Sequence, residues 1–115
     1  MEPVHLSVEV STMDRGLAGR IRDASAQSHL PADGILIGEP RTSRGEELHG
    51  FPTAEVITFA VTLAASVPVS LFSSWLYDLL KERANQVRID SREVNLTEDG
   101  IKEVVWRLTR SQRRY

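Results

Sequence analysis

The sequence predicts an α+β fold, in which a small mixed sheet combines with one long uncharged helix and a C-terminal helix. Three observations support this prediction. Apolar and polar residues alternate at the start of the chain, which is typical of a strand. The 22 residues from Val56 to Tyr77 carry no charge. A short hairpin pattern precedes a helical apolar period near the end. A length of 115 residues suits one domain, and we treat residues 1–115 as a single unit.

The first 40 residues predict a β-α-β unit. The alternation from Val4 to Val10 indicates a strand with one buried face. Ser11 and Thr12 are suited to cap a helix that continues to about Ser28. The tract 34–38, which reads GILIG, is a short buried-strand candidate. Because a β-α-β connection joins parallel strands with a right-handed crossover, we expect these two strands to be parallel neighbours.

A polar tract without any apolar period follows from Gly38 to Pro52, and it predicts a mobile surface loop. The loop contains Glu46, Glu47 and His49. These side chains can form a loop contact or an acid–base cluster, and the alternative is that they are solvated surface charge. A small enzyme centred on them is the weakest of the functional readings.

A long helix is predicted next, capped by Thr53 and ending near Ala84, where Asn85 suits a left-handed stop. Pro68 is expected to kink it, because proline removes a backbone hydrogen bond. Hydroxyl and methyl side chains recur mainly at every fourth position, a spacing that lets another helix approach closely. The predicted partner or oligomer interface consists of Thr58, Ala60, Thr62, Ala64, Ser66, Ser70 and Trp75.

Such a helix would be apolar around most of its circumference, and the short elements around it scarcely supply a cover. Lipid or another polypeptide, including a second copy of the chain, would then cover it; burial inside a self-sufficient monomer is the third alternative. The 22 uncharged residues within this helix would span roughly 33 Å, which is about the thickness of the hydrocarbon core of a bilayer. If it spans, the following Lys81 and Arg83 place the C-terminus in the cytoplasm. Its hydroxyl residues and Pro68 argue against spanning.

The C-terminal segment predicts a hairpin and a helix. The tracts 87–90 and 93–96 flank Ser91 and Arg92, and Thr97 is suited to cap the last helix. The core face of this helix is Ile101, Val104, Val105 and Leu108. A basic stripe of Arg107, Arg110 and Arg114 is suited to contact an anionic surface, either an acidic protein or lipid headgroups. The alternative is that these cations only complement the helix dipole. A net charge of −2 argues against nucleic acid.

The order of elements resembles the small effector-associated constant components of bacterial conflict systems. The resemblance is carried by the uncharged helix ending in Ser74-Trp75-Leu76 and by the hairpin 87–96 that leads into a terminal helix. It implies a non-catalytic accessory component of a defence system, which binds other proteins and acts at membranes or as an oligomer. The alternative is a toxin-neutralising immunity protein or antitoxin. It would use the acidic N-terminal half, with nine acids and five bases over residues 1–55, and the 38–50 loop.

Composition sets further limits on function. The chain has no cysteine, and its histidines, His5, His29 and His49, lack metal-ligand spacing, so we expect no metal or cofactor. No nucleophile elbow or phosphate-binding loop is present in the sequence, and we expect no catalytic activity. The N-terminus lacks the pattern of a secretory signal. We therefore expect a cytoplasmic protein, with membrane association through the uncharged helix as the open alternative.

Overall fold

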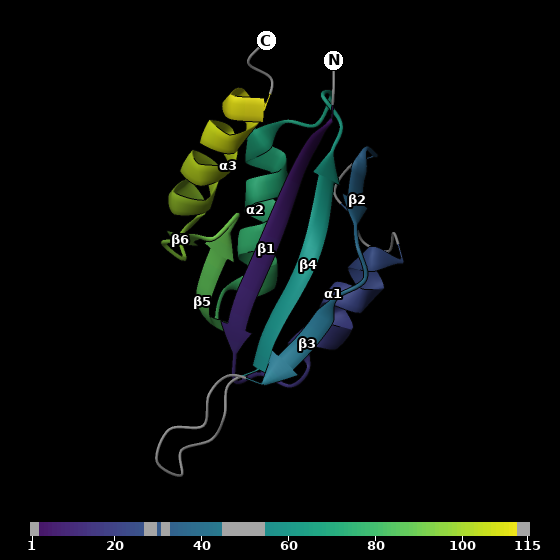
Figure 1. The fold of residues 1–115 in the computed structure, drawn as a ribbon, viewed down its shortest axis with the longest axis vertical. Coiled ribbons are helices and arrows are strands. Elements are labelled where there is room, and N and C mark those ends of the chain that lie inside the picture. Colours follow the sequence, from purple (N-terminus) through teal and green to yellow (C-terminus); the bar gives the residue numbers. More distant parts are fainter. Residues whose placement is uncertain (1–2, 27–29, 31–32, 45–54, 113–115) are drawn as a thin grey trace.

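The computed structural model describes residues 3–26, 30, 33–44 and 55–112, and these residues form an α+β fold of one antiparallel sheet and three helices (Figure 1). The α+β class is therefore confirmed. The elements are β1 (Val4–Thr12), α1 (Leu17–Ser25), β2 (Ile35–Ile37), β3 (Arg41–Arg44), β4 (Glu55–Leu63), α2 (Val69–Leu80), β5 (Ala84–Ile89), β6 (Arg92–Val94) and α3 (Glu98–Gln112).

The sheet has the strand order β2-β4-β1-β5-β6, and β3 pairs with β4. Its centre is the pair β1 and β4, nine residues each, which runs in register from Val4 opposite Leu63 to Thr12 opposite Glu55. All of the strand pairs are antiparallel, so the predicted parallel β-α-β start is wrong. β4 separates β1 from β2 because it offers β1 nine pairing positions, whereas β2 has three residues.

All three helices pack against one face of the sheet (Figure 1). The strands turn their alternating apolar residues toward these helices, as in the buried series Ile57, Phe59, Val61 and Leu63 of β4. α2 contributes Phe72, Leu76 and Leu80 to the same core, and α3 contributes Ile101 and Val105. The opposite sheet face carries no helix among the described elements.

The predicted long helix over 53–84 is wrong, because its residues are divided between β4, a turn and α2. Period-two alternation of β-branched and aromatic residues in β4 favours a strand. Pro68 starts α2 as its N-cap, with φ −64° and ψ 135°, rather than kinking a longer helix. α2 ends at Leu80, and Asn85 lies in β5.

The division of this segment also changes what covers it. Phe59, Phe72 and Leu76 are buried within the fold itself, so the expectation that the chain's own elements could not cover these apolar residues is wrong. Within the described ranges, no helix is both long enough and apolar enough to cross a membrane.

The first helix and the predicted loop have other bounds than predicted, whereas the C-terminal hairpin and helix agree with the prediction. The first helix spans Leu17–Ser25 because β1 continues through Thr12, and residues 41–44 of the predicted loop form β3. Residues 38–40 of the predicted loop connect β2 to β3, whereas residues 45–52 and Thr53 lie outside the described residues. The hairpin of β5 and β6 and the terminal helix are confirmed. The Thr97 hydroxyl caps α3 by accepting a hydrogen bond of 2.9 Å from the Gly100 amide.

Candidate interaction surface

The candidate surface is the sheet face turned away from the helices, which we call the open face. It is built from the outward side chains of the central strands and of β3, because alternate residues of a strand point to opposite faces. Cross-strand register places Ser7 opposite Ala60, and Thr58 between Glu9 and Arg41. The open face consists of His5, Ser7, Glu9, Arg41, Thr58, Ala60 and Thr62.

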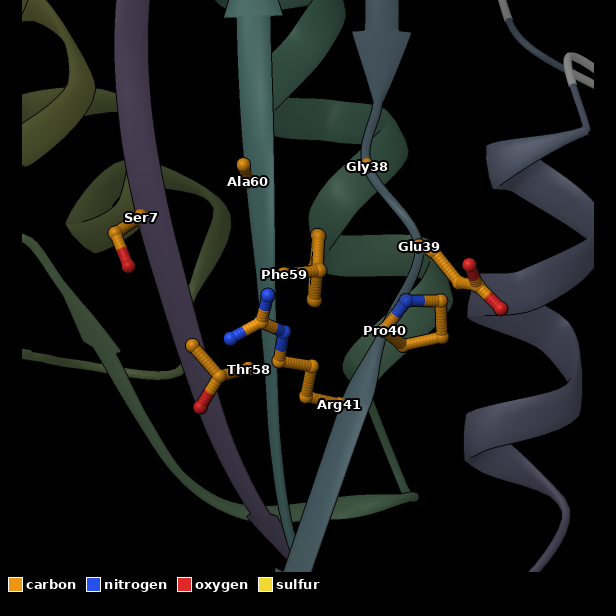
Figure 2. Close-up of a pocket in the computed structure, with 8 residues that line it drawn as sticks. All are labelled: Ser7, Gly38, Glu39, Pro40, Arg41, Thr58, Phe59 and Ala60. Atoms are coloured by element: carbon orange, nitrogen blue, oxygen red, sulfur yellow. The ribbon is translucent and has the colours of Figure 1, made fainter.

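A hollow of about 610 Å³ lies on the open face, where the chain passes from β2 to β3 (Figure 2). The amide of Gly38 donates a hydrogen bond of 2.8 Å to the carbonyl of Ala60. A Cβ at Gly38 would lie 3.4 Å from both the Cβ and the carbonyl oxygen of Ala60. The hollow exists because glycine and alanine leave this part of the sheet without long side chains. The Arg41 side chain reaches across the β4 ribbon and forms one wall (Figure 2).

One end of the open face is held by α3. The amide of His5 donates to the side-chain oxygen of Gln112 at 2.9 Å, and the Gln112 side-chain nitrogen donates to the carbonyl of His5 at 2.6 Å. On the open face, Nδ1 of His5 lies 3.2 Å from the hydroxyl of Thr62. These contacts tie the start of β1 to the last turn of α3, so the end of the surface is a fixed part of the fold.

The centre of the open face presents small hydrogen-bonding groups. It carries the hydroxyls of Ser7, Thr58 and Thr62 and the methyl group of Ala60. Hydroxyl groups both donate and accept hydrogen bonds, so they are suited to contact a polar partner surface. In the part of the chain that the structure describes, no cluster of three or more acidic, histidine or cysteine side chains is placed to hold a metal ion.

The seven residues of the predicted interface do not share one surface. Thr58, Ala60 and Thr62 lie together on the open face, since their even spacing along β4 gives them one orientation. The other four follow β4. Ala64 and Ser66 lie in the turn, Ser70 is exposed in the first turn of α2, and Trp75 is partly buried with its ring centroid 5.9 Å from that of Phe72. A stripe spaced by four residues therefore does not exist as predicted, because half of it belongs to a strand.

Two of the three predicted anion-contacting arginines lie on the outer surface of α3. Arg107 pairs with Glu103 at 2.7 Å, and the Arg110 guanidinium lies 4.6 Å from the ring centroid of Trp106. Trp106 is 49% exposed and was not among the predicted site residues. Its position off the apolar period of the helix was the available signal. Arg114 and the loop residues Glu46, Glu47 and His49 lie outside the described residues.

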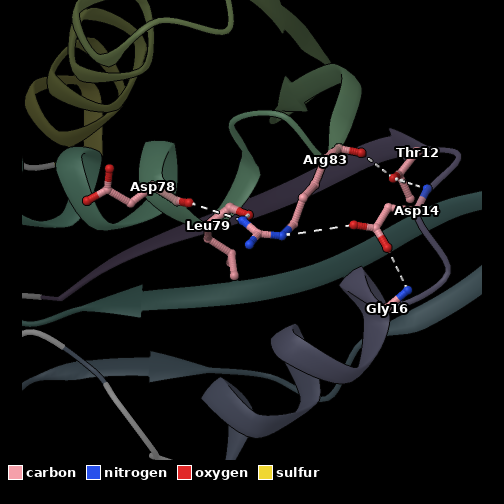
Figure 3. A network of polar contacts seen from close by, with 6 residues as sticks. All are labelled: Thr12, Asp14, Gly16, Asp78, Leu79 and Arg83. Carbon is pink, nitrogen blue, oxygen red and sulfur yellow. Dashed lines mark hydrogen bonds and ion pairs between the residues drawn. The ribbon is translucent and has the colours of Figure 1, made fainter.

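A polar network between β1, α1 and α2 has a structural explanation (Figure 3). Arg83 donates to the carbonyl of Leu79 at 3.2 Å, near the C-terminal end of α2, and its Nε lies 3.9 Å from the Asp14 carboxylate. The buried Thr12 hydroxyl donates to the carbonyl of Arg83 and accepts from the Asp14 amide. A cation bonded to the last carbonyls of a helix stabilises that end. We therefore interpret this network as a structural contact that holds β1, α1 and α2 together.

Comparisons with known proteins give little further information. No family model matches the chain, and no curated protein matches it. Among solved structures, the chain is similar to the stable protein CutA1 from the psychrotrophic bacterium Shewanella sp. SIB1. The identity is 14%, the match covers 77% of this chain and 81% of that chain, and the TM-score is 0.37. This likeness carries no argument about function.

Proposed function

We propose that the protein is a non-catalytic protein-interaction domain that binds its partner through the open face, as an accessory component of a bacterial defence or conflict system. The observation that supports the interaction role is the face of the central strands β1 and β4, which presents short polar side chains and which no described helix covers. The assignment to a defence system comes from the part of the sequence resemblance that the observed fold retains, which is Ser74-Trp75-Leu76 in α2 followed by the β5–β6 hairpin and α3.

The open face allows close approach of a partner. Its centre has no side chain longer than threonine at positions 7, 58, 60 and 62, so the Arg41 side chain that crosses β4 is the long side chain that an approaching backbone or sheet would meet there. The adjoining hollow of about 610 Å³ offers a place for one protruding partner side chain.

The sheet edges are less suited to this role. An added strand needs an uninterrupted row of free amides and carbonyls. β2 and β3, which share one edge, have three and four residues and are separated at Pro40, which has no amide proton. β6 at the other edge has three residues. We therefore place the partner on the face rather than on an edge.

Charges on the open face and at its border favour one orientation of a bound partner. The cross-strand row through Thr58 has Arg41 on one side and Glu9 on the other, and Arg88 on β5 borders the open face beside Glu9. Charges of alternating sign around a neutral centre favour one orientation of a complementary partner and penalise others. A row of this kind contributes to specificity more than to affinity.

The test uses two variants with the same chemical change. Ala60→Arg places a long cation in the centre of the open face, whereas Ala26→Arg places it at an exposed position just after α1. Each tagged variant is expressed in the native host, crosslinked and purified, and captured proteins are quantified by mass spectrometry. A partner retained by wild type and Ala26→Arg is expected to be lost at least tenfold with Ala60→Arg. Circular dichroism checks that both variants fold. Equal capture by both variants would refute the open face as the binding surface.

A further inference from the structure

The outer surface of α3 carries an exposed aromatic residue between cations. Lys102, Trp106 and Arg110 are spaced by four residues, so they lie in one row along the helix, and all three are exposed. Arg107 lies beside this row. We call these four residues the basic ridge. The opposite side of α3 contributes Ile101, Val105 and Leu108 to the core, so the ridge points away from the sheet.

Trp106 is unusual in its surroundings. It is the one exposed aromatic side chain among the described residues, and the Arg110 guanidinium covers part of its ring at 4.6 Å. Trp106, Arg107, Arg110 and Ser111 line a hollow of about 430 Å³. Tryptophan combines a large apolar ring with a polar N–H, and this combination favours the interface between water and lipid headgroups.

The described charge along the ridge is positive. Residues 102–112 contain three bases, Lys102, Arg107 and Arg110, and one acid, Glu103, whose carboxylate lies 2.7 Å from Arg107. The other acids of α3, Glu98 and Asp99, are in its first turn, at the opposite end of the helix from this excess. A surface with this charge complements anionic lipid headgroups.

We propose that the basic ridge docks the domain on the surface of a bilayer that contains anionic phospholipids. Trp106 enters the headgroup region, while Lys102 and Arg110 on either side face lipid phosphates. This contact is peripheral, and it does not depend on the proposed function of the open face, because α3 lies on the other side of the sheet (Figure 1).

The geometry favours lipid over single-stranded nucleic acid. Proteins that bind single strands stack successive bases on several aromatic rings. Here one ring is exposed in the described part of α3, and Arg110 already occupies one of its faces. A bilayer surface requires neither a free ring face nor a second aromatic residue.

The experiment measures binding of the full chain to vesicles by sedimentation. Vesicles of phosphatidylcholine alone are compared with vesicles that also contain phosphatidylglycerol. We expect binding to the anionic vesicles only, and weaker binding at higher salt. Each unit of positive charge lost at the surface lowers the partition coefficient about fivefold, so Arg110→Glu, which removes two units, is expected to lower it about 25-fold.

Two variants serve as controls. Arg20→Glu makes the same charge change at an exposed position of α1, and it is expected to alter binding by less than fivefold. Trp106→Phe leaves Trp75 as the single tryptophan, so the blue shift of fluorescence on binding should disappear if Trp106 enters the headgroups. Thermal unfolding confirms that each variant folds.

Three outcomes would overturn the proposal. The first is no binding to anionic vesicles, and the second is an equal loss with Arg20→Glu and Arg110→Glu. The third is a tighter affinity for a single-stranded oligonucleotide than for the vesicles, with the same dependence on Arg110, which would assign the ridge to nucleic acid.

Discussion

Replacing Ser73 by alanine is expected to stabilise the protein. Ser73 lies in α2 and is 0% exposed, and its hydroxyl has no hydrogen-bond partner among the described residues. A buried hydroxyl that loses its water contacts without gaining a partner costs about 1–3 kcal/mol. Alanine removes this cost and adds a few tenths of a kcal/mol in helix propensity, while the missing oxygen leaves only a small void.

The expected gain is about 1–2 kcal/mol in the free energy of unfolding, which corresponds to a rise in Tm of roughly 4 °C or more for a domain of this size. Ser74→Ala is the matched control, because Ser74 lies in the same helix and is only partly buried. It receives the same helix-propensity gain without removing a fully buried hydroxyl.

Urea unfolding followed by circular dichroism measures both variants against the wild type. We expect Ser73→Ala to exceed Ser74→Ala by about 1 kcal/mol. An equal effect of the two variants, or destabilisation by Ser73→Ala, would show that the Ser73 hydroxyl is satisfied in solution and that α2 packs differently from this structure.

Three further substitutions test local features by urea unfolding. Gly100→Ala is expected to destabilise by about 2 kcal/mol, because its Cβ would lie 2.6 Å from the carbonyl oxygen of Asn95; an unchanged stability would contradict this packing. Gly19→Ala in α1 is the counterpart, since nothing lies within 4 Å of its Cβ, and it should stabilise by about 0.5–1 kcal/mol. Thr12→Val removes the buried hydroxyl bonded to the Arg83 carbonyl and should cost about 2 kcal/mol; a loss below about 0.5 kcal/mol would refute that role of the network.

Local sequence signals were sufficient where one period dominates. The alternation from Val4 to Val10 has no competing helical reading, and it is β1 in the structure. The terminal helix combines a cap at Thr97 with an apolar face that includes Ile101 and Val105, and both features are present as predicted.

The uncharged segment fits both a helical and a strand period, and the predicted helical period is wrong for residues 55–63. Thr58 and Thr62 are four residues apart, which fits a helix, but they also alternate with Phe59 and Val61, which fits a strand. The turn between β4 and Pro68 contains no charged residue, and its exposed serine is Ser66. The sequence therefore contains no charge signal that would separate the strand from the helix. The strand and the helix each bury one face, so apolar residues occur throughout both.

Local sequence patterns could not predict the order of the strands in the sheet. β1 and β2 are close in sequence, yet β4 lies between them, and only the tertiary structure brings Ser7 beside Ala60. The sequence predicted part of the open face, namely Thr58, Ala60 and Thr62, but it placed them on a helix, whereas they share one side of a strand. The basic ridge was found in part through Arg107 and Arg110, whereas Trp106 was missed because an exposed aromatic residue breaks the apolar period.

The most direct test of the account is cysteine accessibility along β4. The chain contains no cysteine, so single substitutions at positions 57–62 can be labelled individually with a maleimide under native conditions. A period of two is predicted, with rapid labelling at Thr58, Ala60 and Thr62 and protection at Ile57, Phe59 and Val61. Protection that recurs with a period of about 3.6 residues, or that is uniform along the segment, would contradict both the strand and the open face built on it.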